Sequence, residues 1–135
     1  MGGISTSKKS TKNELQDYVS WFEIPAIDFE QAVNFYNHIF GIQMAQNKTD
    51  VNSMAFFPVT SGIGGAIISG PGSVPSDTGP LIYLNGGKDL DNVLSKVEGA
   101  GGRIVMPKTP IGEEVGYFAI FIDSQGNKLA LHSKN

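Results

Sequence analysis

Two stretches of the chain repeat apolar residues at the spacing of a one-sided helix. The first runs from Asp28 to Gly41, and the second from Asp89 to Gly101-Gly102. In each, an aspartate can accept a hydrogen bond from the first turn, and glycine can adopt the left-handed conformation that ends a helix. The apolar faces are Phe29, Ala32, Val33, Tyr36 and Phe40 in the first stretch, and Leu90, Val93, Leu94 and Val97 in the second. The pattern predicts two amphipathic helices, each with one buried face.

Shorter apolar runs bounded by turn residues predict strands around each helix. One strand is expected before each helix, at residues 18–24 and 81–85. Three are expected after each helix, at residues 42–46, 53–59 and 66–69, then at 103–107, 117–122 and 128–133. Pro58 cannot donate to a strand ladder, so we expect its strand to lie at a sheet edge or to contain a bulge. The predicted order is βαβββ, twice.

The two halves also align with each other at a constant offset of 61 residues. Asp28 falls on Asp89 and Gly41 on Gly102, and the apolar positions between them coincide. The same offset holds over several elements, which indicates a structural duplication.

Composition and length are those of one domain. With 135 residues, of which 40% are hydrophobic, the chain can bury a single core. We expect a polar tail at residues 1–17 and one domain at residues 18–135. Within it, module one spans about residues 18–69, a Gly- and Pro-rich linker residues 70–79, and module two about residues 80–133. Met1-Gly2 with Thr6 fits an N-myristoylation pattern, but such short patterns often match by chance, and a plain polar tail is the favoured interpretation.

Charge and cysteine content exclude several classes of protein. The chain has no cysteine, which rules out disulfides and thiolate metal sites. Its net charge is −3 and its basic residues are scattered apart from three near the start, so no nucleic-acid partner is expected. No window has the apolar length for stable membrane insertion, and a cytoplasmic protein is predicted.

The residues resemble the vicinal oxygen chelate superfamily of glyoxalases, bleomycin-resistance proteins and extradiol dioxygenases. The resemblance spans residues 19–133 and is closest to the branch labelled "related to lactoylglutathione lyase". It implies an α+β fold in which two βαβββ modules form an incompletely closed eight-stranded barrel, with the helices outside. It rests on Phe22-Glu23-Ile24-Pro25 with Asp28, Ala32-Val33-x-Phe35-Tyr36-x-x-x-Phe40-Gly41, Gly64-Gly65-Ala66, and Gly116-Tyr117-Phe118-Ala119-x-Phe121-x-Asp123-x-x-Gly126-Asn127-x-x-x-Leu131-His132-Ser133.

The resemblance also implies where a metal would be held. Metal-dependent members carry His, Gln or Glu on the first strand of each module and Glu on the last. Counting from the shared motifs places these positions at Trp21, Leu81, Ala130, and Ile67 or Ser69. Only the serine hydroxyl among these could bind a divalent ion, and one weak ligand cannot hold it. We therefore predict no cofactor and no metal ligands.

Five residues are candidates for a ligand site. Glu23 shares a strand face with Trp21, and Tyr83, Asn85 and His132 fall on the corresponding face of module two. An apolar cavity with a few convergent polar groups is typical of a small-molecule site. Glu23 could orient a ligand, act as a general base, or join His132 in a residual metal site.

Three functions are consistent with these observations. The first is a metal-free barrel that binds a small organic ligand, as the bleomycin-resistance relatives do. The second is a glyoxalase-like lyase, an isomerase or a dioxygenase that uses Glu23, with or without a metal. The third is a dimeric interaction module with a vestigial cavity. The resemblance implies a homodimer in each case.

Overall fold

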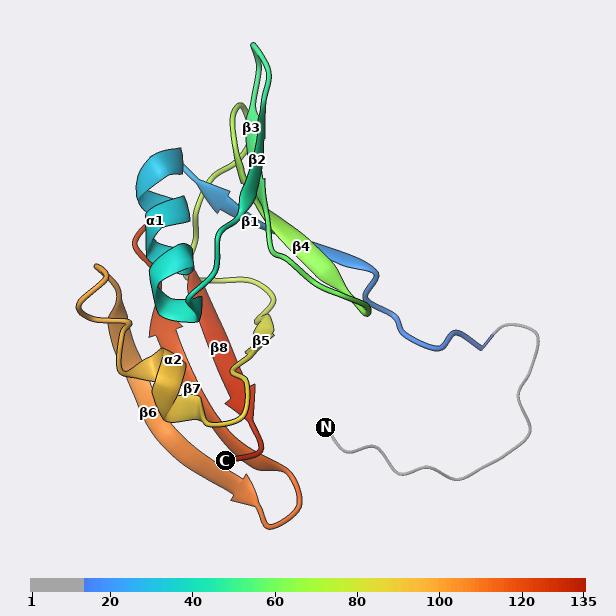
Figure 1. Cartoon of the computed structure of the whole chain (residues 1–135), viewed down its shortest axis with the longest axis vertical. Coiled ribbons are helices and arrows are strands. Elements are labelled where there is room, and N and C mark those ends of the chain that lie inside the picture. Colours follow the sequence, from blue (N-terminus) through green and yellow to red (C-terminus); the bar gives the residue numbers. More distant parts are fainter. Residues whose placement is uncertain (1–13) are drawn as a thin grey trace.

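The computed structural model describes residues 14–135, so the first part of the predicted tail and its myristoylation pattern lie outside the described residues. Module one consists of β1 (Trp21–Ala26), α1 (Phe29–Phe40), β2 (Ala45–Lys48), β3 (Ser53–Phe56) and β4 (Gly64–Ser69). Module two consists of β5 (Tyr83–Asn85), α2 (Leu90–Leu94), β6 (Arg103–Gly112), β7 (Gly116–Ile122) and β8 (Lys128–Ser133). The predicted βαβββ order is confirmed in both modules (Figure 1).

The eight strands form two four-stranded mixed sheets with the same topology. The first sheet has the order β1-β4-β3-β2, and the second has the order β5-β8-β7-β6. In each sheet the first strand of the module pairs in parallel with the last, and the other pairs are antiparallel. The shared topology confirms the duplication and the predicted α+β fold class.

The first helix begins and ends where its caps predict. The Asp28 carboxylate accepts a hydrogen bond from the N–H of Gln31, and Gly41 closes the helix at φ 63° and ψ 43°. The second helix is shorter than predicted, because α2 ends at Leu94 and the chain continues to Gly101 in turns. Most hydrogen bonds of those turns span three residues, as from the N–H of Val97 to the carbonyl of Leu94. The predicted apolar face of this segment is nevertheless buried, since Val97 is fully buried.

Several strand boundaries differ from the prediction. β1 begins at Trp21 rather than at residue 18, and β6 extends to Gly112. β3 ends at Phe56, before Pro58, and it lies inside its sheet between β2 and β4. The expectation of an edge or bulged strand at Pro58 was therefore wrong, because the strand stops before the proline. The prolines of β6 follow the rule, since β6 is an edge strand whose register shifts repeatedly along β7.

The two modules pack through α1, which contacts both β4 of its own module and α2 of the other. The ring of Phe35 stacks on that of Phe121 in β7, with centroids 6.2 Å apart. The hydroxyl of Tyr36 donates to Oδ2 of Asp123 at 2.7 Å, and both residues are buried. The core thus continues from one module into the other.

A polar turn between β7 and β8 adds a second connection between the modules. Asn127 Nδ2 donates to the carbonyl of Pro25 in β1, and its Oδ1 accepts from the N–H of Ser76 in the linker. Oε1 of Gln125 accepts from the N–H groups of Ile27 and Asp28. The entry to α1 is therefore held by the last hairpin of the chain.

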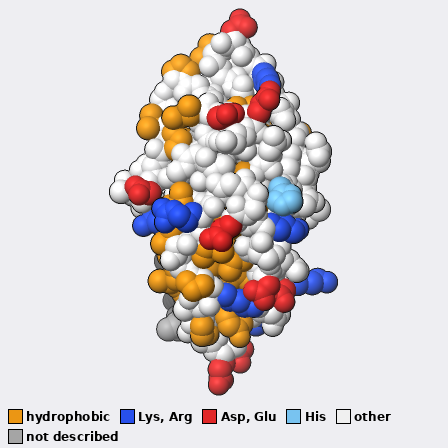
Figure 2. Space-filling model, turned by 90° about the vertical axis from the view of Figure 1, so that its left-hand side faces the viewer, with side chains coloured by type: hydrophobic (Ala, Val, Ile, Leu, Met, Phe, Trp, Pro, Cys, Tyr) orange, Lys and Arg blue, Asp and Glu red, His pale blue; other side chains and the backbone are white. Residues whose placement is uncertain are grey.

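The surface carries both signs of charge. The face with α1, α2 and β6 shows acidic and basic side chains interspersed, with apolar groups between them (Figure 2). No helix within residues 14–135 is long and apolar enough to cross a membrane.

Candidate functional site

Each sheet has a face packed on the helices and an opposite face, here called the open face. Along β1, Ile24 and Ala26 are buried, whereas Trp21 and Glu23 are exposed. The register places Glu23 beside Ala66 in β4, and Ala66 beside Phe56 in β3. Trp21 and Glu23 therefore lie on the open face of the first sheet, as the predicted alternation requires.

On that face the indole of Trp21 supports the carboxylate of Glu23. Nε1 of Trp21 donates to Oε2 of Glu23 at 3.3 Å, and the Trp21 ring lies 6.3 Å from that of Phe56. Trp21 remains 45% exposed. The carboxylate is thus partnered on one side and faces solvent on the other.

The other three predicted residues come together on the second sheet. His132 is the neighbour of Asn85 across one ladder and of Phe118 across the other. Nε2 of His132 lies 2.8 Å from the carbonyl oxygen of Val115, so the imidazole donates there and holds the turn before β7. The ring of Tyr83 lies 6.4 Å from that of Phe118 and is 48% exposed.

The positions that would carry metal ligands were partly misplaced. Ile67 faces the helices and is fully buried, and Ser69 shares its side of β4. The open face of β4 carries Ala66 and Ile68 instead, one residue out of register with the prediction, and a shift of one residue exchanges the two faces of a strand. These side chains have no donor atoms for a divalent ion, and residues 14–135 contain no group of three or more His, Asp or Glu residues placed to hold one. The residues present do not fit the metal that the superfamily resemblance implies.

An apolar cavity lies beside these residues, between the modules. Its volume is about 620 Å³. One wall is formed by the rings of Phe22, Phe40 and Phe57, and the other by residues 80–85, which include Tyr83 and Asn85. Ile63 lies at the border and is 39% exposed. This cavity, here called the intermodule cavity, is of the size that holds a drug-sized molecule.

The five predicted residues do not share one cavity. Tyr83 and Asn85 line the intermodule cavity, whereas Glu23 lines a smaller one of about 270 Å³ with Lys128 beneath the linker. His132 lines a third, with Tyr83 and Asn85, at the edge of the second sheet. Glu23 and His132 are therefore placed on different sheets and in different cavities.

Sequence reasoning did not identify the aromatic wall of the intermodule cavity. The apolar pattern places Phe40 on the buried face of its helix, and Phe22 lies on the face of β1 opposite to Trp21. The rings of Phe40 and Phe57 meet edge to face at 6.3 Å, and those of Phe22 and Phe57 lie 5.5 Å apart. The available signal was that Phe22, Phe40 and Phe57 are large apolar residues close to predicted element ends.

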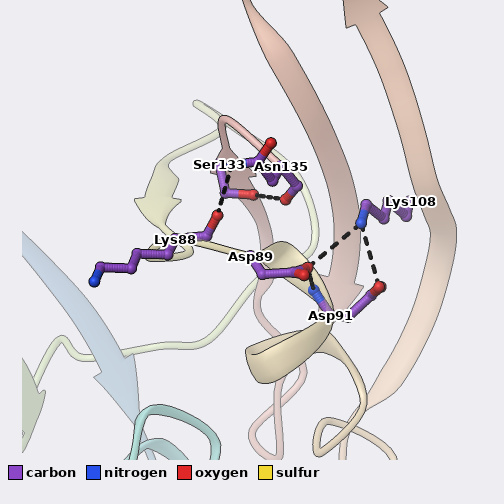
Figure 3. Close-up of polar contacts among 6 residues, drawn as sticks. All are labelled: Lys88, Asp89, Asp91, Lys108, Ser133 and Asn135. Carbon is purple, nitrogen blue, oxygen red and sulfur yellow. Dashed lines mark hydrogen bonds and ion pairs between the residues drawn. The ribbon is translucent and has the colours of Figure 1, made fainter.

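The polar contacts around the start of α2 are structural. Figure 3 shows Nζ of Lys108 between the carboxylates of Asp89 and Asp91, at 3.5 and 3.2 Å. The N–H of Asp91 donates to the carboxylate of Asp89, and this hydrogen bond is the main reason why the pKa of Asp89 is lowered. Asn135 closes the other side, where its Nδ2 donates to the carbonyl of Lys88. These contacts fix the helix to β6 and to the end of the chain.

Comparisons with known proteins agree with this architecture. The sequence model described as "Glyoxalase/Bleomycin resistance protein/Dioxygenase superfamily" matches residues 18–131. A "Glyoxylase-like domain-containing protein" from Didymella fabae is 30% identical over 122 residues, which cover 87% of this chain and 94% of that protein.

Solved structures of low sequence identity share the fold. A glyoxylase/bleomycin resistance protein/dioxygenase domain from Frankia sp. EAN1pec has a TM-score of 0.68 at 15% identity, covering 90% of this chain and all 100% of that one. TnmS3, an antibiotic binding protein from Streptomyces sp. CB03234, has a TM-score of 0.58 at 21% identity, covering 91% of this chain and 100% of its own.

Proposed function

Because the chain belongs to the glyoxalase/bleomycin resistance protein/dioxygenase superfamily, we propose that it binds a small organic ligand in its intermodule cavity, without a metal. The observation that carries the proposal is the cavity itself, which has about 620 Å³ of space, an aromatic wall and few polar side chains. Small-molecule sites typically combine these features. An antibiotic binding protein with the same fold supports binding as a function of such a scaffold.

Binding accounts for the arrangement better than catalysis does. A metal held by Glu23 and His132 would need both residues at one place, but they line different cavities. Glu23 acting as a base without a metal would serve a substrate in the smaller cavity, because Glu23 does not line the intermodule cavity. The Nε2 atom of His132 also has a structural partner in the Val115 carbonyl. We therefore place the glyoxalase-like lyase, isomerase and dioxygenase alternatives, and the lactoylglutathione lyase branch, behind ligand binding.

The test uses Nile red, a neutral apolar dye whose emission rises on transfer from water to an apolar site. We expect saturable binding to the unmodified protein. Ile63→Phe adds a ring at the border of the cavity and should weaken binding at least tenfold, which is about 1.4 kcal/mol. Val51→Phe is the matched control, because Val51 is 65% exposed and lies outside the cavity lining. Equal binding by the three proteins would contradict the proposal.

We also propose that the protein is a homodimer whose interface covers the open faces. Trp21 on the first sheet and Tyr83 on the second are about half exposed, at 45% and 48%, and aromatic side chains of this kind are enriched at interfaces between proteins. A second copy could cover both faces by reciprocal contact.

Sedimentation at several protein concentrations tests the dimer. We expect twice the mass of the chain, and Trp21→Lys should shift the equilibrium toward the monomer. Val74→Lys, a change at a linker residue that is 71% exposed, should leave it unchanged. A monomer at all concentrations would overturn the dimer but not the ligand site.

A further inference from the structure

The intermodule cavity has an edge strand as one of its walls. β5 is the outermost strand of the second sheet, where it pairs only with β8 (Figure 1). Six consecutive residues, 80–85, line the cavity. A continuous run of this kind presents main-chain atoms as well as alternate side chains to the space beside it.

The hydrogen bonds to β8 determine which main-chain groups face the cavity. The carbonyl of Ile82 accepts from the N–H of Ala130 at 2.9 Å, and the N–H of Gly86 donates to the carbonyl of His132 at 2.7 Å. Even-numbered residues therefore bond to β8. Since successive residues of a strand direct their main-chain groups to opposite edges, the N–H and C=O of Tyr83 and Asn85 point to the free edge.

That edge has no strand partner within the described part of the chain, residues 14–135. Within β5, the outward donors of the wall are the N–H groups of Tyr83 and Asn85. A donor and an acceptor on an unpaired strand edge can pair with an extended amide group, as occurs when a peptide adds a strand to a sheet.

The remainder of the lining restricts charge. None of the described residues that line the cavity is Lys, Arg, His, Asp or Glu. Moving a charged group from water into such a site costs desolvation free energy, and the lining has no opposite charge to compensate for it. The opposite wall, with Phe22, Phe40 and Phe57, offers flat apolar contact to a ring or an alkyl group.

From these observations we propose that the ligand is a neutral molecule with a secondary amide and an apolar group. Its amide pairs with the main chain of Tyr83 and Asn85, and its apolar part packs on the aromatic wall. This inference rests on the proposed binding function and defines the ligand class for that site. It excludes anionic conjugates of glutathione as occupants of the cavity, because these carry carboxylates.

The experiment measures displacement of Nile red by a set of small probes. N-acetylphenylalanine methylamide is neutral and has two secondary amides beside an aromatic ring. Its analogue with both amide nitrogens methylated keeps the ring and loses the donors, and we expect it to bind at least tenfold more weakly. N-acetylphenylalanine, which ends in a carboxylate, should also bind at least tenfold more weakly.

A pair of variants locates the effect on the strand edge. Tyr83→Pro removes the outward N–H without removing a bond to β8, and Tyr83→Ala removes the side chain but keeps that N–H. We expect Tyr83→Ala to preserve the preference for the secondary amide, and Tyr83→Pro to reduce it severalfold. Melting temperatures establish whether both variants are folded. If Tyr83→Pro is unfolded, the comparison of the amide probe with its methylated analogue on the unmodified protein still tests the inference.

The outcomes separate the inference from the proposed function. The strand-edge inference is overturned if the amide probe and its methylated analogue displace the dye equally, or if the amide probe does not displace it. The proposed ligand site still holds in that case if Ile63→Phe weakens dye binding. Stronger displacement by the carboxylate probe overturns the neutral ligand class. If Ile63→Phe leaves the affinity for the dye unchanged, both the proposed ligand site and the inference are overturned.

Discussion

At the scale of single residues, the buried phenol of Tyr36 is the most consequential polar group of the core. It is fully buried and donates to Asp123, which also accepts from the side chain and the main chain of Asn127. Burial raises the pKa of Tyr36 well above its ordinary value, and the negative charge and hydrogen bond of Asp123 act in the same direction. The neutral phenol is therefore part of the folded structure.

We predict that Tyr36→Phe lowers the free energy of unfolding at pH 7 by about 1.5–3 kcal/mol, the range for a hydrogen bond to a charged group. The ring remains, so the loss is that of the hydrogen bond and not of packing. Urea denaturation of the two proteins measures the difference. A loss below about 0.5 kcal/mol would contradict a buried charge-assisted bond.

The same pair of proteins should respond differently to alkaline pH. Because the pKa of Tyr36 is raised in the folded state, its contribution to stability is complete below the ordinary tyrosine value of 10.0 and declines as pH rises above it. The unfolded chain then releases a proton that the folded chain retains. We expect the stability advantage of the natural protein over Tyr36→Phe to shrink as the pH rises from about 10 to about 11.5. An advantage independent of pH would contradict the raised pKa.

Residue-scale reasoning from the sequence predicted strand faces better than it predicted the site. Alternation placed Trp21 with Glu23, and Tyr83 with Asn85, on faces that the structure keeps. It could not say that Glu23 and His132 would line separate cavities, because that depends on how the two sheets are placed in space. It also could not reveal the contact of His132 with Val115, which joins a strand to a distant turn.

At the scale of elements, β7 depends on a glycine at its first position. Gly116 has φ 105°, and a Cβ built there would lie against the carbonyl oxygen of Ser133 and the main chain of Lys134. Gly126 has a similar φ of 96°, but a Cβ there would meet nothing within 4 Å. The two glycines therefore share a conformational requirement and differ in the space around them.

We predict that Gly126→Ala costs about 1–2 kcal/mol, the strain of a left-handed conformation for a residue with a Cβ. Gly116→Ala should cost about 1–3 kcal/mol more, because the main chain of β8 must also move. Denaturant unfolding of both variants provides the comparison. Equal losses would show that β7 and β8 do not approach as closely as the structure places them.

Elements were predictable where local chemistry decides them. Asp28 and Gly41 predicted the ends of α1, and the constant offset between the halves predicted that both share one order of elements. The length of α2 was not predictable, because the turns after Leu94 keep Val97 buried as a longer helix would. Apolar periodicity therefore identified which residues are buried, but it did not determine whether a helix or a series of turns buries them.

At the scale of the whole molecule, the apolar pattern of the sequence contained no signal for which residues of the two modules pack against each other. Periodicity predicts that a face is buried but not what covers it, and here α1 is covered partly by β7 of the other module through Phe35 and Phe121. The intermodule cavity follows from the same arrangement, since its two walls come from different modules. A site between modules is visible only once that packing is known.

Because the core and the turn between β7 and β8 join the modules, we expect them to unfold together. Asn127 is 5% exposed and connects β1 of module one, the linker and the turn through its amide and main chain. Asn127→Ala leaves the Pro25 carbonyl and the Ser76 N–H without these partners, and should lower stability by about 2–4 kcal/mol. Gln125→Ala is the matched control, since the Gln125 contacts are largely exposed to water and their loss should cost about 1 kcal/mol or less.

Calorimetry with hydrogen exchange separates coupled from independent modules. We expect Asn127→Ala to melt in one transition at a lower temperature, with protection reduced in β4 and β8 by similar factors, because a fully cooperative unit loses protection throughout. Two transitions, or reduced protection confined to the second sheet, would mean that the modules fold separately. In that case the walls of the intermodule cavity could also move apart independently, and ligand binding would have to supply the free energy that holds them together.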